Sequence, residues 1–202
     1  MSPEFIVAVI VTIVGAATPI LLAALGELVV EKSGVLNLGV EGMMLIGAVT
    51  GFAVTSATGS PWLGVLAAAM AASASSMIFG FLTLSLSANQ VATGLALTIF
   101  GGGFSALAGK AFLGKTIPPF TNVFPPELAQ DPILKVFFGY SPIVYFSLVM
   151  VVAVAWFLKS TRAGLILRAV GENDLSAHSI GYSVVGVRYA AVAFGGAMAG
   201  IG

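Results

Sequence analysis

The sequence predicts an all-α, polytopic integral membrane protein with about five complete transmembrane helices plus the start of a sixth. Of the 202 residues, 58% are hydrophobic and only 8% are charged, whereas soluble proteins carry about 25% charged residues. Apolar runs recur between short polar gaps, and their length is near the about twenty residues that a helix needs to cross a bilayer. The alternation over about ten residues that is typical of membrane β-strands does not occur.

Composition also excludes several classes of function. The chain has no cysteine and one histidine, so disulfides and cysteine-based zinc or haem sites are ruled out. A metal-ligand cluster or a nucleophile–base pair cannot be assembled from these residue types. We therefore expect no catalytic residue, metal or cofactor. Eight basic residues balance eight acidic ones, which argues against nucleic acid as a partner.

The first predicted span covers residues 5–25, and the second opens at Asn37 and Glu41 and reaches about residue 54. Two interpretations of this opening remain. Asn37 can cap the helix while Glu41 complements the helix dipole. Alternatively, the run after Met43 is too short to span, so the helix begins within the membrane. An ionisable group at that depth usually faces a cavity or pathway.

The third predicted span begins at Trp62, an interfacial anchor, and the fourth covers residues 91–112. Small residues recur every four positions in the third span and predict a face for close helix packing: Ala68, Ala72, Ser76 and Gly80. Gly47 and Gly51 predict the same in the second span. The hydroxyls of the fourth span, at Thr93, Thr98 and Ser105, are expected to bond to their own helix.

Residues 109–116 match the phosphate-binding pattern G-x-x-x-x-G-K-[ST] letter for letter. That loop requires a preceding strand and a following helix, so that backbone amides converge on the anion. A membrane helix is predicted before it, and Pro118 and Pro119 would break a helix after it. Nucleotide binding is therefore not expected here.

The proline-rich residues 117–142 predict a loop with one short surface helix near 128–138, followed by a fifth span over 143–158. A sixth apolar run starts near Tyr189 and leaves too few residues before Gly202 to cross a bilayer. We therefore expect a single transmembrane domain over residues 1–202 that is incomplete at its C-terminus.

The polar stretch 159–188 carries half of the basic residues, namely Lys159, Arg162, Arg168 and Arg188. Juxtamembrane basic residues stay in the cytoplasm, so this stretch, Lys32 and Asn89 are predicted to be cytoplasmic, with Ser60 and residues 117–142 outside.

Within this stretch, Gly171 and Gly181 bracket a predicted short helix that Asn173 or Asp174 caps. Its small apolar side is expected to consist of Leu175, Ala177 and Ile180.

The sequence of this stretch resembles the cytoplasmic coupling loop of ABC-transporter permeases in the branched-chain amino acid, ribose and nucleoside importer superfamily. The matching positions are Thr161, Arg162, Gly164, Arg168, Ala169, Gly171, Glu172, Asn173, Ala177, Gly181 and Arg188. A second motif, Gly26-Glu27 followed by SGVLNLGVEG at 33–42, resembles the corresponding sequence in the nucleoside and simple-sugar branch.

The resemblance implies a permease subunit of an ABC importer in the plasma (inner) membrane, carrying a small polar solute such as a nucleoside or simple sugar. It further implies a cytoplasmic ATPase subunit that hydrolyses the ATP, a second permease subunit, the same or different, and an extracytoplasmic substrate-binding protein. The chain itself is then not an enzyme. The implied ATPase-coupling residues are Gly171, Glu172, Asn173, Ala177, His178 and Gly181. Asn89 joins Asn37 and Glu41 as a candidate for the solute path.

Other functions remain open at this point. A permease for branched-chain amino acids fits the same resemblance. A secondary transporter or channel usually places carboxylates or histidine within the membrane, and this sequence offers Glu41 near a membrane edge and His178 in the polar stretch. A non-transporting membrane scaffold is the third class.

Overall fold

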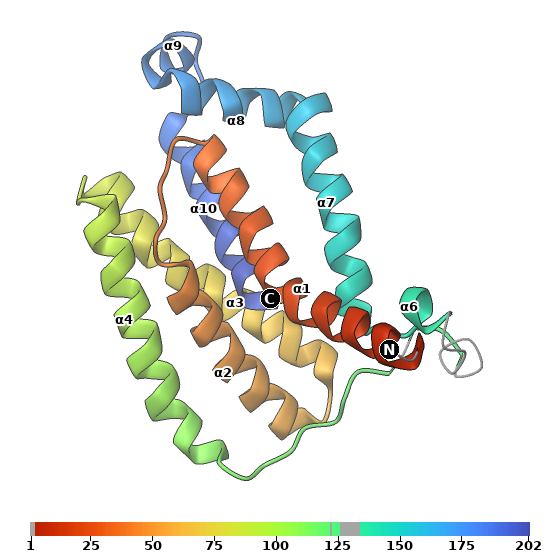
Figure 1. Cartoon of the computed structure of the whole chain (residues 1–202). Helices are drawn as coiled ribbons and strands as arrows, with labels where there is room; N and C mark the ends of the chain where they lie inside the picture. Colours follow the sequence, from red (N-terminus) through yellow and green to blue (C-terminus); the bar gives the residue numbers. More distant parts are fainter. Residues whose placement is uncertain (1–2, 122, 126–133) are drawn as a thin grey trace.

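The computed structural model describes residues 3–121, 123–125 and 134–202, and these form helices joined by loops (Figure 1). The elements are α1 (Pro3–Lys32), α2 (Val40–Thr58), α3 (Pro61–Gly80) with a π-helical continuation (Phe81–Ser85), α4 (Gln90–Gly109) with a 3-10 turn (Lys110–Phe112), α6 (Lys135–Phe138), α7 (Pro142–Ser160), α8 (Arg162–Glu172), α9 (Asp174–Ser179) and α10 (Val184–Ile201). Six helices of the described part are long and apolar enough to cross a membrane. The predicted all-α membrane fold is confirmed.

The outer surface of the bundle is apolar along the spans. Large side chains that point away from the chain include Ile20 on α1, Ile99 and Leu107 on α4, and Val152 on α7, each more than two thirds exposed. Such a surface is unfavourable in water but suits lipid, since every backbone group of a helix is satisfied internally. The bundle is therefore built for a bilayer.

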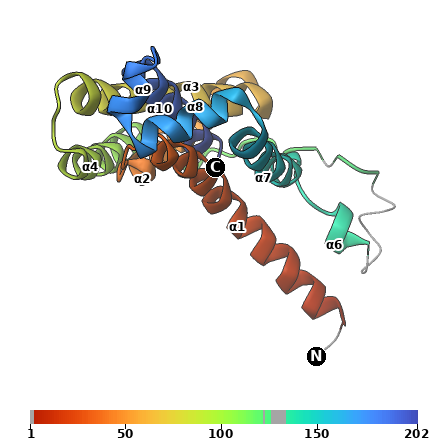
Figure 2. The ribbon, with the colours of Figure 1, turned by 90° about the horizontal axis from the view of Figure 1, so that it is seen from above.

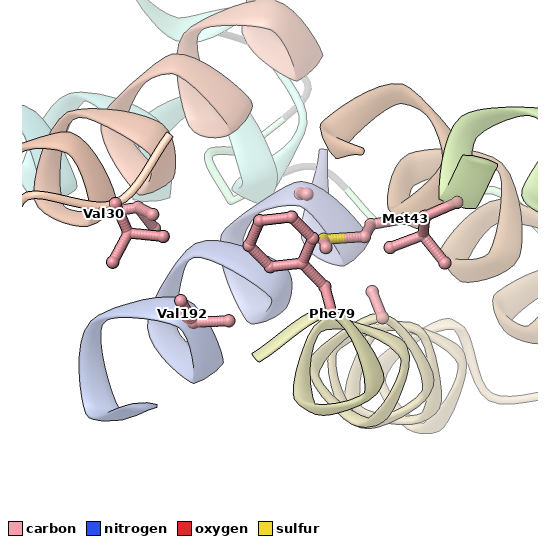
Figure 3. Packing of buried hydrophobic residues seen from close by; sticks show 8 residues of the cluster. Val30, Met43, Phe79 and Val192 are labelled. Atoms are coloured by element: carbon pink, nitrogen blue, oxygen red, sulfur yellow. The ribbon is translucent and has the colours of Figure 1, made fainter. Parts of the chain in front are cut away.

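The core lies where α1, α2, α3 and α10 meet. Figure 3 shows Val30, Met43, Phe79 and Val192 converging from these four helices. The first half of α1 extends away from α2, α3, α4 and α10 (Figure 2), and α7 packs beside its second half.

The predicted small-residue face of α3 is confirmed. Ala68, Ala72, Ser76 and Gly80 are all buried. A side chain added at Gly196 of α10 would collide with Ser76, and one added at Gly200 would collide with the Ala68 carbonyl. Small residues on both helices therefore let the two backbones approach closely. Gly47 of α2 meets Gly200 in the same way.

Several predicted boundaries shift. Helix α1 continues to Lys32, beyond residue 25, and α10 begins at Val184, before Tyr189. The expectation that the sixth run is too short to cross a membrane is therefore wrong, because α10 from Val184 to Ile201 is long enough. The Ser183 hydroxyl caps α10 by accepting the Gly186 N–H at 3.2 Å. Arg188, a charge placed outside the span by sequence reasoning, lies inside α10 because its side chain finds polar partners.

Other expectations concern the segment after α4. The motif at residues 109–116 begins at the last residue of α4 and contains the 3-10 turn, so a helix and not a strand precedes it, which agrees with its rejection as a nucleotide site. Of the helix expected near 128–138, α6 covers 135–138, and residues 126–133 lie outside the described part.

The ends of the bundle agree with the predicted grouping of loops. The end of α1, the start of α4 and helices α8 and α9 lie at one end, and the α2–α3 turn lies at the other (Figure 1). Lys32 and Asn89 thus share an end with α8 and α9, while Ser60 lies opposite.

Candidate functional site

Residues 33–39, called here the linker, connect α1 to α2 and begin at a glycine turn. Gly34 has a φ of +82°. Its N–H donates to the Glu31 carbonyl at 2.9 Å, and the Val35 N–H donates to the Val30 carbonyl at 3.4 Å. This pair of bonds is a Schellman motif, which ends a helix with a residue in the left-handed region.

The linker then runs into the bundle, so that α2 begins partway along the length of the bundle and not at its end (Figure 1). Side chains from α1 and α4 satisfy its backbone. Glu27 Oε1 accepts the Asn37 N–H at 3.0 Å, Gln90 Oε1 accepts the Leu36 N–H at 2.8 Å, and the Thr98 hydroxyl donates to the Leu38 carbonyl at 3.0 Å. Non-helical backbone at membrane depth is tolerated only where protein or a water-filled cavity covers it.

None of these three supports was predicted from the sequence. The expectation that the Thr98 hydroxyl bonds to its own helix is wrong, because the linker brings the Leu38 carbonyl beside it. Glu27 was not assigned a role at the linker. Its second oxygen, Oε2, is buried and has no hydrogen-bond partner in the described part of the chain.

Glycines of α4 hold the linker by direct backbone contact. A side chain added at Gly94 would lie 2.8 Å from the Leu38 nitrogen, and one at Gly101 would collide with the Gly42 carbonyl. The start of α2 is therefore clamped against α4 with no room for a methyl group.

The three residues proposed for a path occupy different environments. Asn37 is 2% exposed, and its Oδ1 accepts the Gly39 N–H at 2.9 Å at the start of α2. Glu41 is exposed in the first turn of α2. Asn89 is exposed and caps α4, since its Oδ1 accepts the Ala92 N–H at 3.0 Å. Gln90, the first residue of α4, makes the hydrogen bond that joins this helix start to the linker. The prediction that Asn37 caps α2 is therefore wrong, because Gly39 is the N-cap of that helix and Asn37 bonds to its N–H. Asn89 is the residue that caps its helix, α4.

A sharp turn joins α7 to α8. The Thr161 hydroxyl donates to the Phe157 carbonyl at 2.7 Å and accepts the Gly164 N–H at 3.0 Å. Helix α8 lies across the ends of α1 and α7 (Figure 1), with Gly164, Leu167 and Val170 buried. Sequence reasoning treated this region as loop, which is wrong. Its apolar residues at helical spacing were the available signal.

Helix α9 confirms the predicted short helix. Asn173 Oδ1 accepts the Ser176 N–H at 2.9 Å at its start. At its end Gly181 has a φ of +92°, and the N–H groups of Gly181 and Tyr182 donate to the carbonyls of His178 and Ala177. This is a second Schellman motif and gives Gly181 its predicted role.

The role predicted for Gly171, a turn before the short helix, is corrected. Gly171 lies inside α8, where an added side chain would collide with the Lys32 carbonyl and lie 3.0 Å from the Gly34 nitrogen. Its lack of a side chain lets α8 rest on the end of α1.

The expected apolar side of α9 is also wrong. Ala177 is 2% exposed and packs inward, whereas Leu175 and Ile180 are 80% and 70% exposed. Apolar residues at helical spacing do not reveal that Ala177 is the one buried residue of so short a helix.

The remaining predicted coupling residues, Glu172, Asn173, His178 and Gly181, are exposed. A shallow hollow of about 370 Å³ lies beside them, lined by His178, Gly181, Tyr182, Ser183, Val184 and Val185. The α8–α9 end therefore offers an open surface with apolar and polar groups, set on helices with defined caps.

These features define a multi-pass helical membrane domain in which one helix begins inside the bundle, an arrangement common among transport proteins. The chain belongs to the family described as branched-chain amino acid transport system / permease component, whose profile matches residues 9–202.

Three curated relatives carry related descriptions. The chain is 41% identical to a putative glucose ABC transporter permease protein of Haloferax volcanii, covering 93% of this chain and 58% of the relative. It is 36% identical to the guanosine ABC transporter permease protein of Bacillus subtilis and 30% identical to the nucleoside ABC transporter permease protein of Lactococcus lactis, covering 92% of this chain and 62% of each relative. The chain thus spans about three fifths of these relatives' length. No solved structure matches it significantly.

Proposed function

We propose that this chain is a membrane-spanning permease subunit of an ABC importer in the plasma membrane, which carries a nucleoside or a simple sugar. The family match and the names of the relatives support this class of protein and solute. The proposal treats residues 1–202 as one transmembrane permease domain and residues 159–188 as its cytoplasmic coupling loop. ATP hydrolysis belongs to separate ATPase subunits.

The observation that carries the proposal is the exposed apolar surface of α9. Leu175 on α9 and Ile180 at its C-cap are among the most exposed large apolar side chains of the described chain, yet they belong to a helix with defined caps at one end of the bundle. Exposed apolar groups surrounded by polar ones mark sites of protein–protein interaction. We assign this surface to the ATPase subunit, with Glu172, Asn173, His178 and Gly181 at the contact and Gly171 and Ala177 seating the helices.

The solute path in this proposal passes the start of α2. Glu41 is exposed there, and a carboxylate accepts hydrogen bonds from the hydroxyl groups of sugars and nucleosides. Asn37 and Asn89 border the path only if the linker moves, because in this conformation the Asn37 side chain bonds to the Gly39 N–H and the Asn89 side chain caps α4. A second permease subunit completes the path, and an extracytoplasmic binding protein delivers the solute.

The first test is co-purification of the ATPase subunit with the chain. Leu175→Asn removes an exposed apolar anchor and should weaken ATPase binding by about tenfold, since residues at the centre of an interface often contribute more than about 1.4 kcal/mol. Leu113→Asn is the matched control, because Leu113 is 81% exposed on the segment after α4. Equal retention of the ATPase by both variants would remove α9 from the interface.

The second test is uptake into proteoliposomes of labelled guanosine, glucose and leucine by the transporter assembled with its ATPase. ATP-dependent uptake of guanosine or glucose supports the proposal, and Glu41→Gln should lower it while the ATPase still co-purifies. Uptake of leucine alone would favour the branched-chain amino acid alternative. Uptake without any ATPase would favour a secondary transporter or channel.

A further inference from the structure

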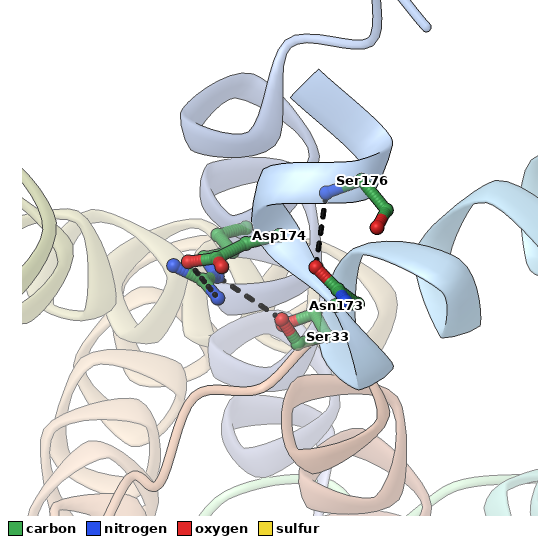
Figure 4. Close-up of polar contacts among 5 residues, drawn as sticks. Ser33, Asn173, Asp174 and Ser176 are labelled. Carbon is green, nitrogen blue, oxygen red and sulfur yellow. Dashed lines mark hydrogen bonds and ion pairs between the residues drawn. The ribbon is translucent and has the colours of Figure 1, made fainter. Parts of the chain in front are cut away.

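Three elements far apart in the sequence meet at the guanidinium of Arg188 on α10. Its Nε donates to the Ser33 carbonyl at 3.1 Å, across 155 positions of the chain. Its Nη2 lies 3.5 Å from Asp174 Oδ2 at the start of α9. Figure 4 shows the group, with Ser33 below and Asp174 above. One side chain thus bridges the first residue of the linker and the first residue of α9.

The two contacts of Arg188, with Ser33 and with Asp174, differ in strength. Ser33 is fully buried, and its hydroxyl donates to the Val30 carbonyl at 2.6 Å, so its carbonyl is a rigid acceptor. A hydrogen bond from a charged donor is stronger than a neutral one. The Asp174 side chain is 51% exposed, and an ion pair at such a site contributes little and is easily broken. Arg188 is therefore held on the linker side and adjustable on the α9 side.

A second contact runs in parallel with the bridge. Gly171 of α8 lies against the Lys32 carbonyl and the Gly34 nitrogen so closely that no side chain would fit. A movement of α8 and α9 therefore cannot leave residues 32–34 in place unless this contact opens. The helix pair meets the linker at its first residues through both contacts.

From Ser33 the linker leads within a few residues to the start of α2. Leu36, Asn37 and Leu38 are each bonded through the backbone to a side chain of α1 or α4. Since these bonds tie the linker to α1 and α4, a shift at Ser33 changes the bonds that hold Asn37 and the first turn of α2.

We propose that Arg188 is a positioning residue that transmits the position of α9 to the linker and thus to the start of α2. This inference rests on the proposed function, because it assigns to α9 the ATPase contact and to the start of α2 the solute path. It adds that Arg188 connects the two sites and that the position of α9 determines the position of the start of α2.

The structural test uses spin labels on cysteines introduced at Ser176 and Leu36, which are the only thiols because the chain has no cysteine. Both positions are exposed. Arg188→Gln should broaden the distance distribution between the labels in the purified chain. Arg162→Gln is the matched control, since Arg162 is an exposed arginine at the start of α8, and it should leave the distribution unchanged.

Arg188→Lys is a second, more conservative variant, which keeps the test valid if Arg188→Gln fails to fold. Lysine keeps the positive charge, but its single ammonium cannot reproduce the fork with which arginine holds two acceptors. It should also broaden the distribution, to a smaller extent. A distribution of wild-type width in both Arg188 variants would overturn the inference.

The functional test compares solute uptake with ATP hydrolysis in the assembled transporter. Arg188→Gln should lower the solute carried per ATP by about fivefold or more, the lower end of typical coupling between sites, while the ATPase still co-purifies. A wild-type ratio in Arg188→Gln would overturn the inference alone. Failure of the ATPase to co-purify with the wild-type chain would instead overturn the proposed function.

Discussion

The carboxylate of Glu27 accepts a hydrogen bond from the backbone N–H of Asn37 at 3.0 Å. This bond joins the last turns of α1 to the linker that follows α1 in the chain. The Asn37 side chain in turn accepts the Gly39 N–H at 2.9 Å. A carboxylate on one span thus supports the linker to the next span, at a residue ten positions later in the chain. This relationship makes Glu27 a structural determinant of where α2 begins.

Replacing Glu27 with leucine should destabilise the linker. The Asn37 N–H would lose its acceptor in a buried setting, which costs about 1–3 kcal/mol. Glu27→Gln keeps an acceptor oxygen and should retain most of the stability. Thermal unfolding in detergent measures both variants, and Glu31→Leu, an exposed site on the same helix, is the control. An equal loss in Glu31→Leu would show that the effect does not come from the linker.

Gly101→Ala should be far more damaging than Gly103→Ala, although both glycines lie in α4. A side chain at Gly101 would collide with the Gly42 carbonyl, whereas nothing lies within 4 Å of one at Gly103. Overpacking of this kind costs about 1–3 kcal/mol, and alanine in an open helical position is neutral or slightly stabilising. Thermal stability in detergent decides between them, and similar melting temperatures would contradict the clamp between α2 and α4.

Substitutions of Asn89 separate a cap from a path residue. Aspartate preserves the acceptor for the Ala92 N–H, so Asn89→Asp should keep the stability of α4, while Asn89→Ala should lose about 1 kcal/mol. If Asn89 serves only as a cap, solute uptake by Asn89→Asp will equal that of the wild type. Loss of uptake in a stable Asn89→Asp protein would instead assign the residue to the path.

Arginine at position 177 should open α9, because Ala177 is buried against the chain. The neighbouring variant His178→Arg adds the same side chain at an exposed site. Both create one new trypsin site within α9, so their cleavage rates are directly comparable. Ala177→Arg should be cleaved faster by about an order of magnitude, which corresponds to about 1.4 kcal/mol of local opening. Equal rates would show that Ala177 does not seat the helix.

Labelling of single cysteines checks the orientation of the bundle. A membrane-impermeant maleimide should label Ser60→Cys in intact cells, and it should label Ser176→Cys only after the membrane is opened. The reason is that basic residues concentrate at the α8–α9 end, and such residues remain in the cytoplasm. Labelling of Ser176→Cys in intact cells would reverse the orientation and with it the proposed ATPase contact.

Much of the fold could be predicted from the sequence, because membrane helices are determined by local properties. A run of about twenty apolar residues satisfies its own backbone in lipid, whatever surrounds it. The small-residue face of α3 and the cap and glycine end of α9 are likewise encoded by residue type at fixed spacing, as Ala72 and Gly181 illustrate. These predictions required no knowledge of which helices become neighbours.

Tertiary structure alone decided the contacts that distinguish the two candidate sites. That Thr98 bonds to the linker, that Ala177 faces inward while Leu175 faces outward, and that Arg188 reaches Ser33 all depend on how distant segments pack. A hydroxyl or a guanidinium can be satisfied by its own helix, by water or by another segment. The choice among these partners is made by position in space, since a polar group in the membrane bonds to whichever acceptor the folded chain brings within reach.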